Sequence, residues 1–178
     1  MGLNHMQQPP AERPGDKVHL FVVHLVPPAR SPQHPRLRVD IGVDEYSSEA
    51  TGSVSNENPR AHIDFLRQVL KATPYPIHQI CTADDPMFRD REFNDACMLA
   101  GVSHIFTPRG PRVMRVQSWL ERCVDAAYEI APQALENINI SRVLIDQAFQ
   151  RVYNETPNCA LDGKTPTQLR REFFENNS

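Results

Sequence analysis

The hydrophobic positions change their period along the chain, from strand-like runs in the first third to helical spacing afterwards. Apolar and β-branched residues nearly fill 18–26, a looser alternation covers 37–43, and 50–55 follows a polar turn at 44–48. A continuous apolar run is typical of a strand buried on both faces, so we expect 18–26 at the centre of a sheet. The three segments together predict an antiparallel meander, with the proline-rich residues 27–35 as a loop.

Helical spacing begins after Asn58-Pro59, a pair typical of a helix N-terminus, and predicts a helix to about Ala72. Further strands are predicted at 77–82 and 102–107, and further helices at 90–100, 113–130, 141–153 and 166–174. This order predicts an α/β fold in which a five-stranded mixed sheet is flanked by helices. Residues 1–16, rich in Gln and Pro, are expected to be a disordered N-terminal segment, and 17–178 one domain.

Composition narrows the classes of function. The net charge is −3, so no overall positive field attracts nucleic acid, and any DNA contact needs a local patch. No apolar run approaches the ~20 residues of a membrane-spanning helix, so no membrane partner is expected. The cysteines are widely spaced without a CxxC pair, which indicates reduced, mostly buried thiols in a cytoplasmic protein. They are Cys81, Cys97, Cys123 and Cys159.

Two motifs carry a family resemblance. One is a C-terminal run in which Tyr153-Asn154 is followed by Ala160-Leu161 and then by Gly163-Lys164-Thr165-Pro166. The other is Asp44-Glu45-Tyr46-Ser47, an Asp-x-x-Ser turn that ends the second predicted strand. In this order and at this distance they resemble the catalytic core of retroviral integrases and bacterial insertion-sequence transposases. The resemblance covers roughly residues 17–174. It implies a ribonuclease H-like fold and an origin in a mobile element, with a role in DNA integration or transposition.

Active enzymes of this family hold two Mg²⁺ or Mn²⁺ ions with three carboxylates, because hard cations require anionic oxygen ligands. Alignment on the family's motifs places the three acidic positions at Phe21, Ala83 and Ser118. None of the three is a carboxylate. The resemblance therefore implies a core without catalytic residues, metal or cofactor, either a remnant or a domesticated derivative. It also implies that Phe21 and Ala83 are neighbours in the sheet, with Ser118 facing them from the long helix.

Two alternatives stay open. In the first, Asp84, Asp85 and Glu121 act as relocated ligands of an active metal-dependent polynucleotidyl transferase. Against it, Glu121 lies one helical turn, about 5 Å, from Ser118, and the three acids are ordinary for a solvated turn and helix face. In the second alternative, the chain is a non-catalytic module that binds DNA or assembles with protein, as a homodimer or together with an active transposase.

Basic residues line the loop and first turns of the helix predicted at 113–130. They are Arg109, Arg112, Arg115 and Arg122. The resemblance places DNA on this side, and the amides of a helix N-terminus favour phosphate. The expectation is weak DNA binding without sequence preference. The alternative is a solvated face of mixed charge, because Glu121 and Asp125 share part of this surface.

Overall fold

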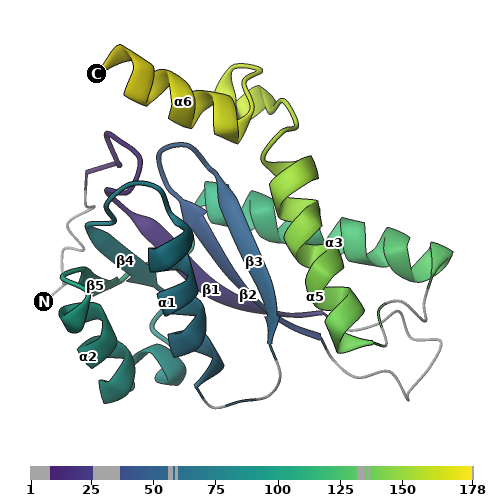
Figure 1. Ribbon diagram of the computed structural model, residues 1–178, viewed down its shortest axis with the longest axis horizontal. Helices are drawn as coiled ribbons and strands as arrows, with labels where there is room; N and C mark the ends of the chain where they lie inside the picture. The colour runs from purple at the N-terminus through teal and green to yellow at the C-terminus, as the bar shows by residue number, and fades with distance from the viewer. Residues whose placement is uncertain are drawn as a thin grey trace, which may run out of the picture.

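The computed structural model describes residues 9–25, 37–55, 58, 60–131, 135 and 137–177. Within them, five strands form one mixed sheet in the order β3-β2-β1-β4-β5 (Figure 1). The strands are β1 (Val18–Leu25), β2 (Leu37–Asp44), β3 (Ala50–Ser55), β4 (Gln79–Thr82) and β5 (Ser103–Phe106). Strands β1, β2 and β3 pair antiparallel, whereas β4 is parallel to β1 and β5 is parallel to β4. The predicted antiparallel meander and the five-stranded mixed sheet are therefore confirmed.

Helices cover both faces of the sheet, with α1 and α2 in front of it and α3 behind it in the view of Figure 1. The helices are α1 (Ala61–Ala72), α2 (Arg91–Leu99), α3 (Pro111–Ile130), α5 (Ile138–Gln147) and α6 (Pro166–Asn176). Short helical turns occupy Pro86–Phe88, Ala148–Tyr153 and Cys159–Leu161. The helices lie where the sequence predicts them, except that α5 begins three residues early, because Asn137 accepts hydrogen bonds from the amides of Asn139 and Ile140. No helix of the described residues is long and apolar enough to cross a membrane.

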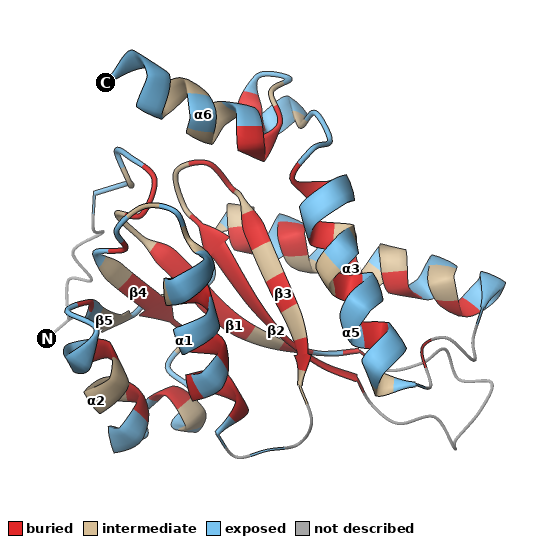
Figure 2. Cartoon of the chain, viewed as in Figure 1, coloured by how far each residue is buried: buried red, intermediate tan, exposed pale blue. Residues whose placement is uncertain are grey.

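The two faces of β1 enter two separate cores, because successive side chains of a strand point to opposite sides. Phe21, Val23 and Leu25 pack with α3 and α5 in one cluster. Val18 and Leu20 pack with α1 and α2 in the other. Strand β2 is buried over its whole length, and Figure 2 shows the buried residues concentrated in the sheet and on the helix sides that face it.

The end of α5 approaches β3 closely because β3 carries a glycine there. The chain leaves α5 through a π-helical turn, Ala148–Tyr153, which directs the Phe149 ring onto the strand. A Cβ at position 52 would lie only 2.3 Å from that ring, so Gly52 makes room for it. Phe149 is fully buried as a result and joins the α3 side of the core.

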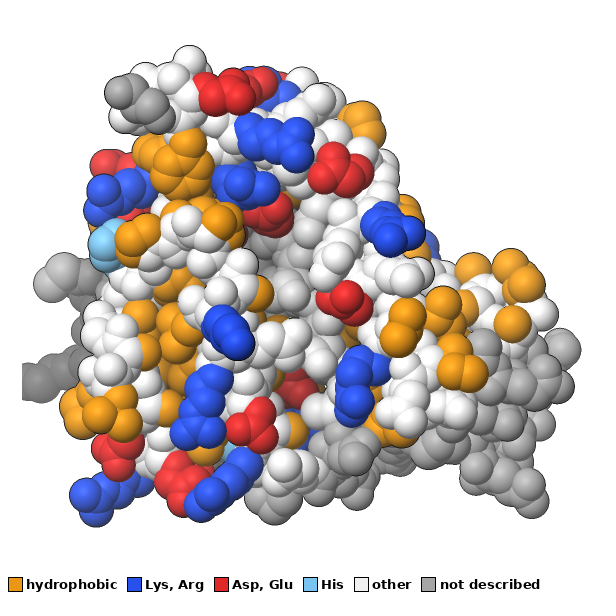
Figure 3. All heavy atoms as spheres, viewed as in Figure 1, with side chains coloured by type: hydrophobic (Ala, Val, Ile, Leu, Met, Phe, Trp, Pro, Cys, Tyr) orange, Lys and Arg blue, Asp and Glu red, His pale blue; other side chains and the backbone are white. Residues whose placement is uncertain are grey.

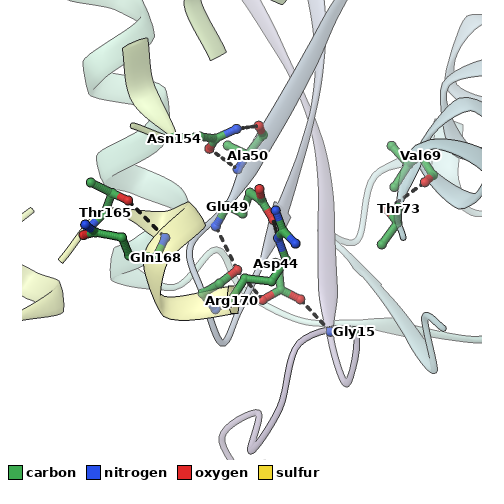
Figure 4. A network of polar contacts seen from close by, with 11 residues as sticks. Gly15, Asp44, Glu49, Ala50, Val69, Thr73, Asn154, Thr165, Gln168 and Arg170 are labelled. Atoms are coloured by element: carbon green, nitrogen blue, oxygen red, sulfur yellow. Dashed lines mark hydrogen bonds and ion pairs between the residues drawn. The ribbon is translucent and has the colours of Figure 1, made fainter. Parts of the chain in front are cut away.

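Part of the predicted N-terminal segment, within residues 9–16, contacts the rest of the domain. The carboxylate of Asp44 accepts the backbone N–H of Gly15 at 2.7 Å, and it accepts both the N–H and the hydroxyl of Ser47 at 2.8 Å (Figure 4). The N–H of His78 donates to the Gly15 carbonyl, and Pro14 and Gly15 are buried. These contacts hold a segment whose composition suggested disorder. Residues 1–8 and the predicted loop at 27–35 lie outside the described residues.

The C-terminal motif joins three elements through hydrogen bonds. The Asn154 side chain accepts from the Ala50 N–H and donates to the Ala50 carbonyl, both at 2.8 Å (Figure 4). The Asn154 carbonyl in turn accepts from the N–H of Thr167 in α6. Thr165 begins α6 with a reciprocal cap to Gln168. Asn154 and Thr165 of this motif thus have structural roles in the fold.

Candidate functional site

The first of the expected acidic positions is filled by a core phenylalanine. Phe21 lies on β1, faces α3, and is only 2% exposed. Leu20 pairs with Thr82 in the parallel ladder, so Phe21 and Ala83 are the next opposed positions, at the carboxyl end of β4. Ligand sites in α/β sheets commonly form beyond the carboxyl ends of parallel strands. Here that place presents a phenyl ring and a methyl group.

An arginine from the β5–α3 loop covers the phenyl ring. The Arg109 guanidinium carbon lies 5.2 Å from the centroid of Phe21, within cation–π range. Its Nη1 donates to Oε1 of Gln117 at 3.0 Å, and its Nη2 donates to the Val22 carbonyl at 3.4 Å. Gln117 Nε2 then donates to Glu121 Oε1 at 2.9 Å. A cation thus lies over the ring and is held to α3 by its hydrogen bond with Gln117, whose side chain is in turn bonded to Glu121.

The α3 residue beside this arrangement is Gln117, and Ser118 lies elsewhere. Ser118 is exposed and lines a groove on another side of the helix, with Trp119 and Arg122. Gln117 and Ser118 lie on different sides of α3 because consecutive residues of a helix point about 100° apart, so a shift of one position places the side chain on another surface. Alignment on the family's motifs thus selects Ser118, the neighbour in sequence of the residue that contacts Arg109.

The three acids considered as relocated ligands each have another partner. Asp84 is exposed and pairs with Arg89 at 2.6 and 2.7 Å, and the hydrogen bond from Arg89 lowers the pKa of the Asp84 carboxyl. Asp85 accepts from the Met87 N–H at 3.0 Å and caps the turn Pro86–Phe88. Glu121 accepts from Gln117. No cluster of three or more potential metal ligands exists in the part of the chain that the structure describes.

The residues present at this site do not fit a divalent cation. Mg²⁺ requires hard oxygen ligands in octahedral geometry. Phe21 and Ala83 supply no oxygen from their side chains, and the Arg109 guanidinium already places a positive charge over the ring. Gln117 offers an amide oxygen, but that oxygen accepts from Arg109.

The four arginines expected to bind DNA fall in three different places. Arg109 lies over Phe21. Arg112 points to the β2–β3 turn, where Nη1 donates to the carbonyl of Tyr46 at 2.6 Å and also to that of Glu45. Arg115 and Arg122 line the groove that contains Trp119. The structure therefore brings two of the four together.

One hollow was not predicted from the sequence. It measures about 700 Å³ and lies between β4, β5 and the first turn of α3. On its wall, His19 Nε2 lies 2.8 Å from Glu45 Oε2, and the hydrogen bond with His19 lowers the pKa of the Glu45 carboxyl. Cys81 is buried beside them, and burial raises the pKa of its thiol to about 12. The sequence signal that could have indicated this hollow is the two-residue period of β1, which puts His19 on the same face of the sheet as Phe21.

No protein-family profile and no curated protein matches the sequence. Solved structures do match in three dimensions. The catalytic core domain of HTLV-2 integrase, solved in complex with magnesium in a dimeric form, gives a TM-score of 0.68 at 16% identity over 89% of this chain and 98% of that chain. The chain has the fold of a retroviral integrase catalytic core.

Other structures with this fold extend the comparison. The BIV integrase catalytic core domain gives a TM-score of 0.63 at 13% identity, over 92% of this chain and 98% of that one. A chain of the simian T-cell lymphotropic virus intasome, in complex with the PP2A regulatory subunit B56 gamma, gives 0.71 at 18% identity, over 91% of this chain and 56% of that chain. The ribonuclease H-like integrase core expected from the sequence motifs is therefore confirmed as the fold.

Proposed function

We propose that this chain is an integrase-type core, associated with DNA integration or transposition, that does not perform metal-dependent strand transfer. The observation that carries the proposal is the arrangement of Phe21, Arg109 and Gln117. A phenyl ring is buried at the first acidic position, a guanidinium lies over the ring, and an amide on α3 holds the guanidinium. Two divalent cations in this place would meet the positive charge of Arg109, and neither Phe21 nor Ala83 would supply a carboxylate.

The hydrogen bonds of the nearby acids support the loss of chemistry over its relocation. A relocated site needs carboxylates that converge within about 2 Å of a common ion. Asp84 pairs with Arg89, Asp85 caps a turn, and Glu121 bonds to an amide on its own helix. Recruiting the three would break three local interactions and would also require Arg109 to leave the ring.

Titration calorimetry with MnCl₂ at millimolar concentration tests this proposal directly. We expect no stoichiometric binding by the wild-type protein, and no cleavage or strand transfer on a DNA duplex in the presence of Mn²⁺. The matched control is the triple variant D84N/D85N/E121Q, which removes the relocated-ligand candidates and leaves Phe21 in place. Stoichiometric Mn²⁺ binding by the wild type that disappears in the triple variant would overturn the proposal and favour an active transferase.

A role in protein assembly is the second candidate, because α5 exposes a stripe of large apolar side chains. Ile140, Val143 and Leu144 are 45%, 54% and 40% exposed and recur at helical spacing on one face. Figure 3 shows hydrophobic side chains gathered on the surface over α5. Such a stripe fits the homodimer interface of a non-catalytic module. Light scattering should then show a dimer that Val143→Glu converts to a monomer, and a wild-type monomer at high concentration would exclude this role.

A further inference from the structure

The groove on the outer side of α3 has the composition of a site for an acidic ligand. It has a volume of about 420 Å³ and lies between α3 and the segment 153–159, and we call it the α3 groove. The residues that line it are Met114, Arg115, Ser118, Trp119, Arg122, Tyr153, Thr156, Pro157, Asn158 and Cys159. Two are cations and none is an Asp or Glu. The other hollows that contain arginine or lysine side chains also contain carboxylates.

The two arginines of the α3 groove are available to bind a ligand. Arg115 and Arg122 are both exposed, and neither forms an ion pair or a hydrogen bond with any residue that the structure describes. Arg89 and Arg170, in contrast, are each paired with a carboxylate. Seven residues separate Arg115 from Arg122, which places them two turns apart on the same face of α3, about 10 Å along its axis.

The floor between the two cations is apolar and rigid. Trp119 packs edge-on against Tyr153, with ring centroids 4.9 Å apart, and tilts against Phe149 at 5.4 Å. These neighbours fix the indole in the wall of the groove, so it does not offer a free face on which a nucleobase would stack. Met114, which is 54% exposed, adds a flexible apolar surface beside it. The floor therefore suits an aliphatic side chain better than a base.

We propose that the α3 groove binds an extended acidic peptide segment of a partner protein. An extended chain in the polyproline II conformation has three residues per turn and advances about 3.1 Å per residue, so carboxylates three residues apart lie on one side of it, about 9 Å apart, close to the separation of Arg115 and Arg122. An apolar residue between the carboxylates would pack on Trp119 and Met114. This inference goes beyond the proposed function and is independent of it, since the α3 groove does not include Phe21, Arg109 or Gln117.

Fluorescence polarisation with a labelled peptide tests the inference. The probe is an eight-residue peptide with Glu at positions 3 and 6, Leu at position 4 and no other charged side chain. The first comparison peptide has the same composition with its two Glu residues adjacent, and the second ligand is a single-stranded oligonucleotide. We expect the probe to bind at least tenfold more tightly than either. Arg115→Gln and Arg122→Gln should each weaken probe binding about tenfold, whereas Arg67→Gln, on α1 at the other face of the sheet, should leave it unchanged.

Alkylation of Cys159 provides a second readout that does not depend on substitution. Cys159 is exposed and lines the α3 groove, while Cys81 and Cys97 are buried, so bound peptide should slow the modification of Cys159 as followed by mass spectrometry. Absence of probe binding, or equal affinity for the two peptides, would overturn the inference. Tighter binding of the oligonucleotide with the same dependence on Arg115 and Arg122 would also overturn it, and would assign the groove to nucleic acid. Neither result alters the expected failure to bind Mn²⁺.

Discussion

A single side chain changes the chemistry available to this fold. With an aspartate at position 21, β1 would place a carboxylate at the carboxyl end of the parallel strands. Phenylalanine instead joins the core with Val23 and Val113 and attracts the Arg109 guanidinium to its face. Phe21 is therefore part of the hydrophobic core and is expected to contribute to stability.

Phe21→Ala should lower the free energy of unfolding by about 3–5 kcal/mol, because a fully buried ring is removed and a cavity remains. Phe106→Ala is the control. Its ring is 47% exposed and contacts the His104 ring, so we expect a loss of about 1 kcal/mol or less. Urea denaturation of both variants measures the difference. Equal losses in the two variants would show that Phe21 does not support the core as its burial indicates.

His62 gives the fold a pH dependence. His62 lies on α1 and is buried, with its ring beside those of Phe88 and Phe93. Neither ring nitrogen has a hydrogen-bond partner among the described residues. Burial lowers the pKa of His62, and the nearby Arg38 charge lowers it further. As the pH falls below about 6.5, the unfolded chain therefore takes up a proton that the native imidazole resists, and stability is lost.

His62→Leu should make the protein less sensitive to acid. Between pH 7.5 and pH 5, the wild type should lose on the order of 1 kcal/mol more unfolding free energy than the variant, because only the wild type carries this proton uptake. Denaturation curves at the two pH values measure it, and all carboxylates are common to both proteins. At pH 7.5 the variant should be at least as stable, since an unpartnered polar ring has been replaced by an apolar side chain. A parallel loss in the two proteins would contradict the assignment.

Among the elements, the connection from α5 to α6 holds the meander to the C-terminal motif. The π-helical turn places Asn154 against β3, where its amide pairs with both backbone groups of Ala50. π-helical turns are frequent at functional sites, where they redirect the chain. Here the turn has a structural role, because the same asparagine also accepts from the N–H of Thr167 and so positions α6.

Asn154→Ala should cost about 2–3 kcal/mol of unfolding free energy, because it leaves the buried N–H and C=O of Ala50 without partners. The exposed Asn139 of α5 is the matched control, and Asn139→Ala should change stability by less than about 0.5 kcal/mol. Amide hydrogen exchange gives a local measurement, with faster exchange expected at Ala50 in the first variant only. Unchanged protection at Ala50 would show that water or another group replaces the amide.

The strands could be predicted from the sequence to within two residues at each end, because burial on two faces demands long apolar runs such as Val18–Leu25. The features that were not predicted depend on single contacts between residues that are far apart in the sequence. The segment within residues 9–16 contacts the rest of the domain through Asp44, whose partner Gly15 is 29 positions away. Gln117 rather than Ser118 lies beside Arg109 because of the rotation of α3 about its axis, which alignment on sequence motifs does not determine.

For the whole molecule, the distribution of charge matters more than the net value of −3. Acidic and basic side chains alternate over the face seen in Figure 3, and no large field of one sign covers it. Only Arg115 and Arg122 of the four expected arginines share a surface. Duplex DNA approaching that surface can therefore release the counterions of about two phosphates.

Fluorescence anisotropy with duplex DNA at 50 and 200 mM salt distinguishes two phosphate contacts from four. At a slope near −0.9 per contact, two contacts predict that affinity falls about tenfold between these salts, whereas four predict a fall of more than about hundredfold. R115Q/R122Q should remove most of the salt dependence. Arg109→Gln is the control and should leave the slope unchanged, since Arg109 lies over Phe21 on another side of α3. Duplexes of different sequence should bind alike, because phosphate contacts carry no direct sequence information. A slope near −3.6 that is also reduced by Arg109→Gln would show that the arginines bind DNA as one surface, with Arg109 released from the ring.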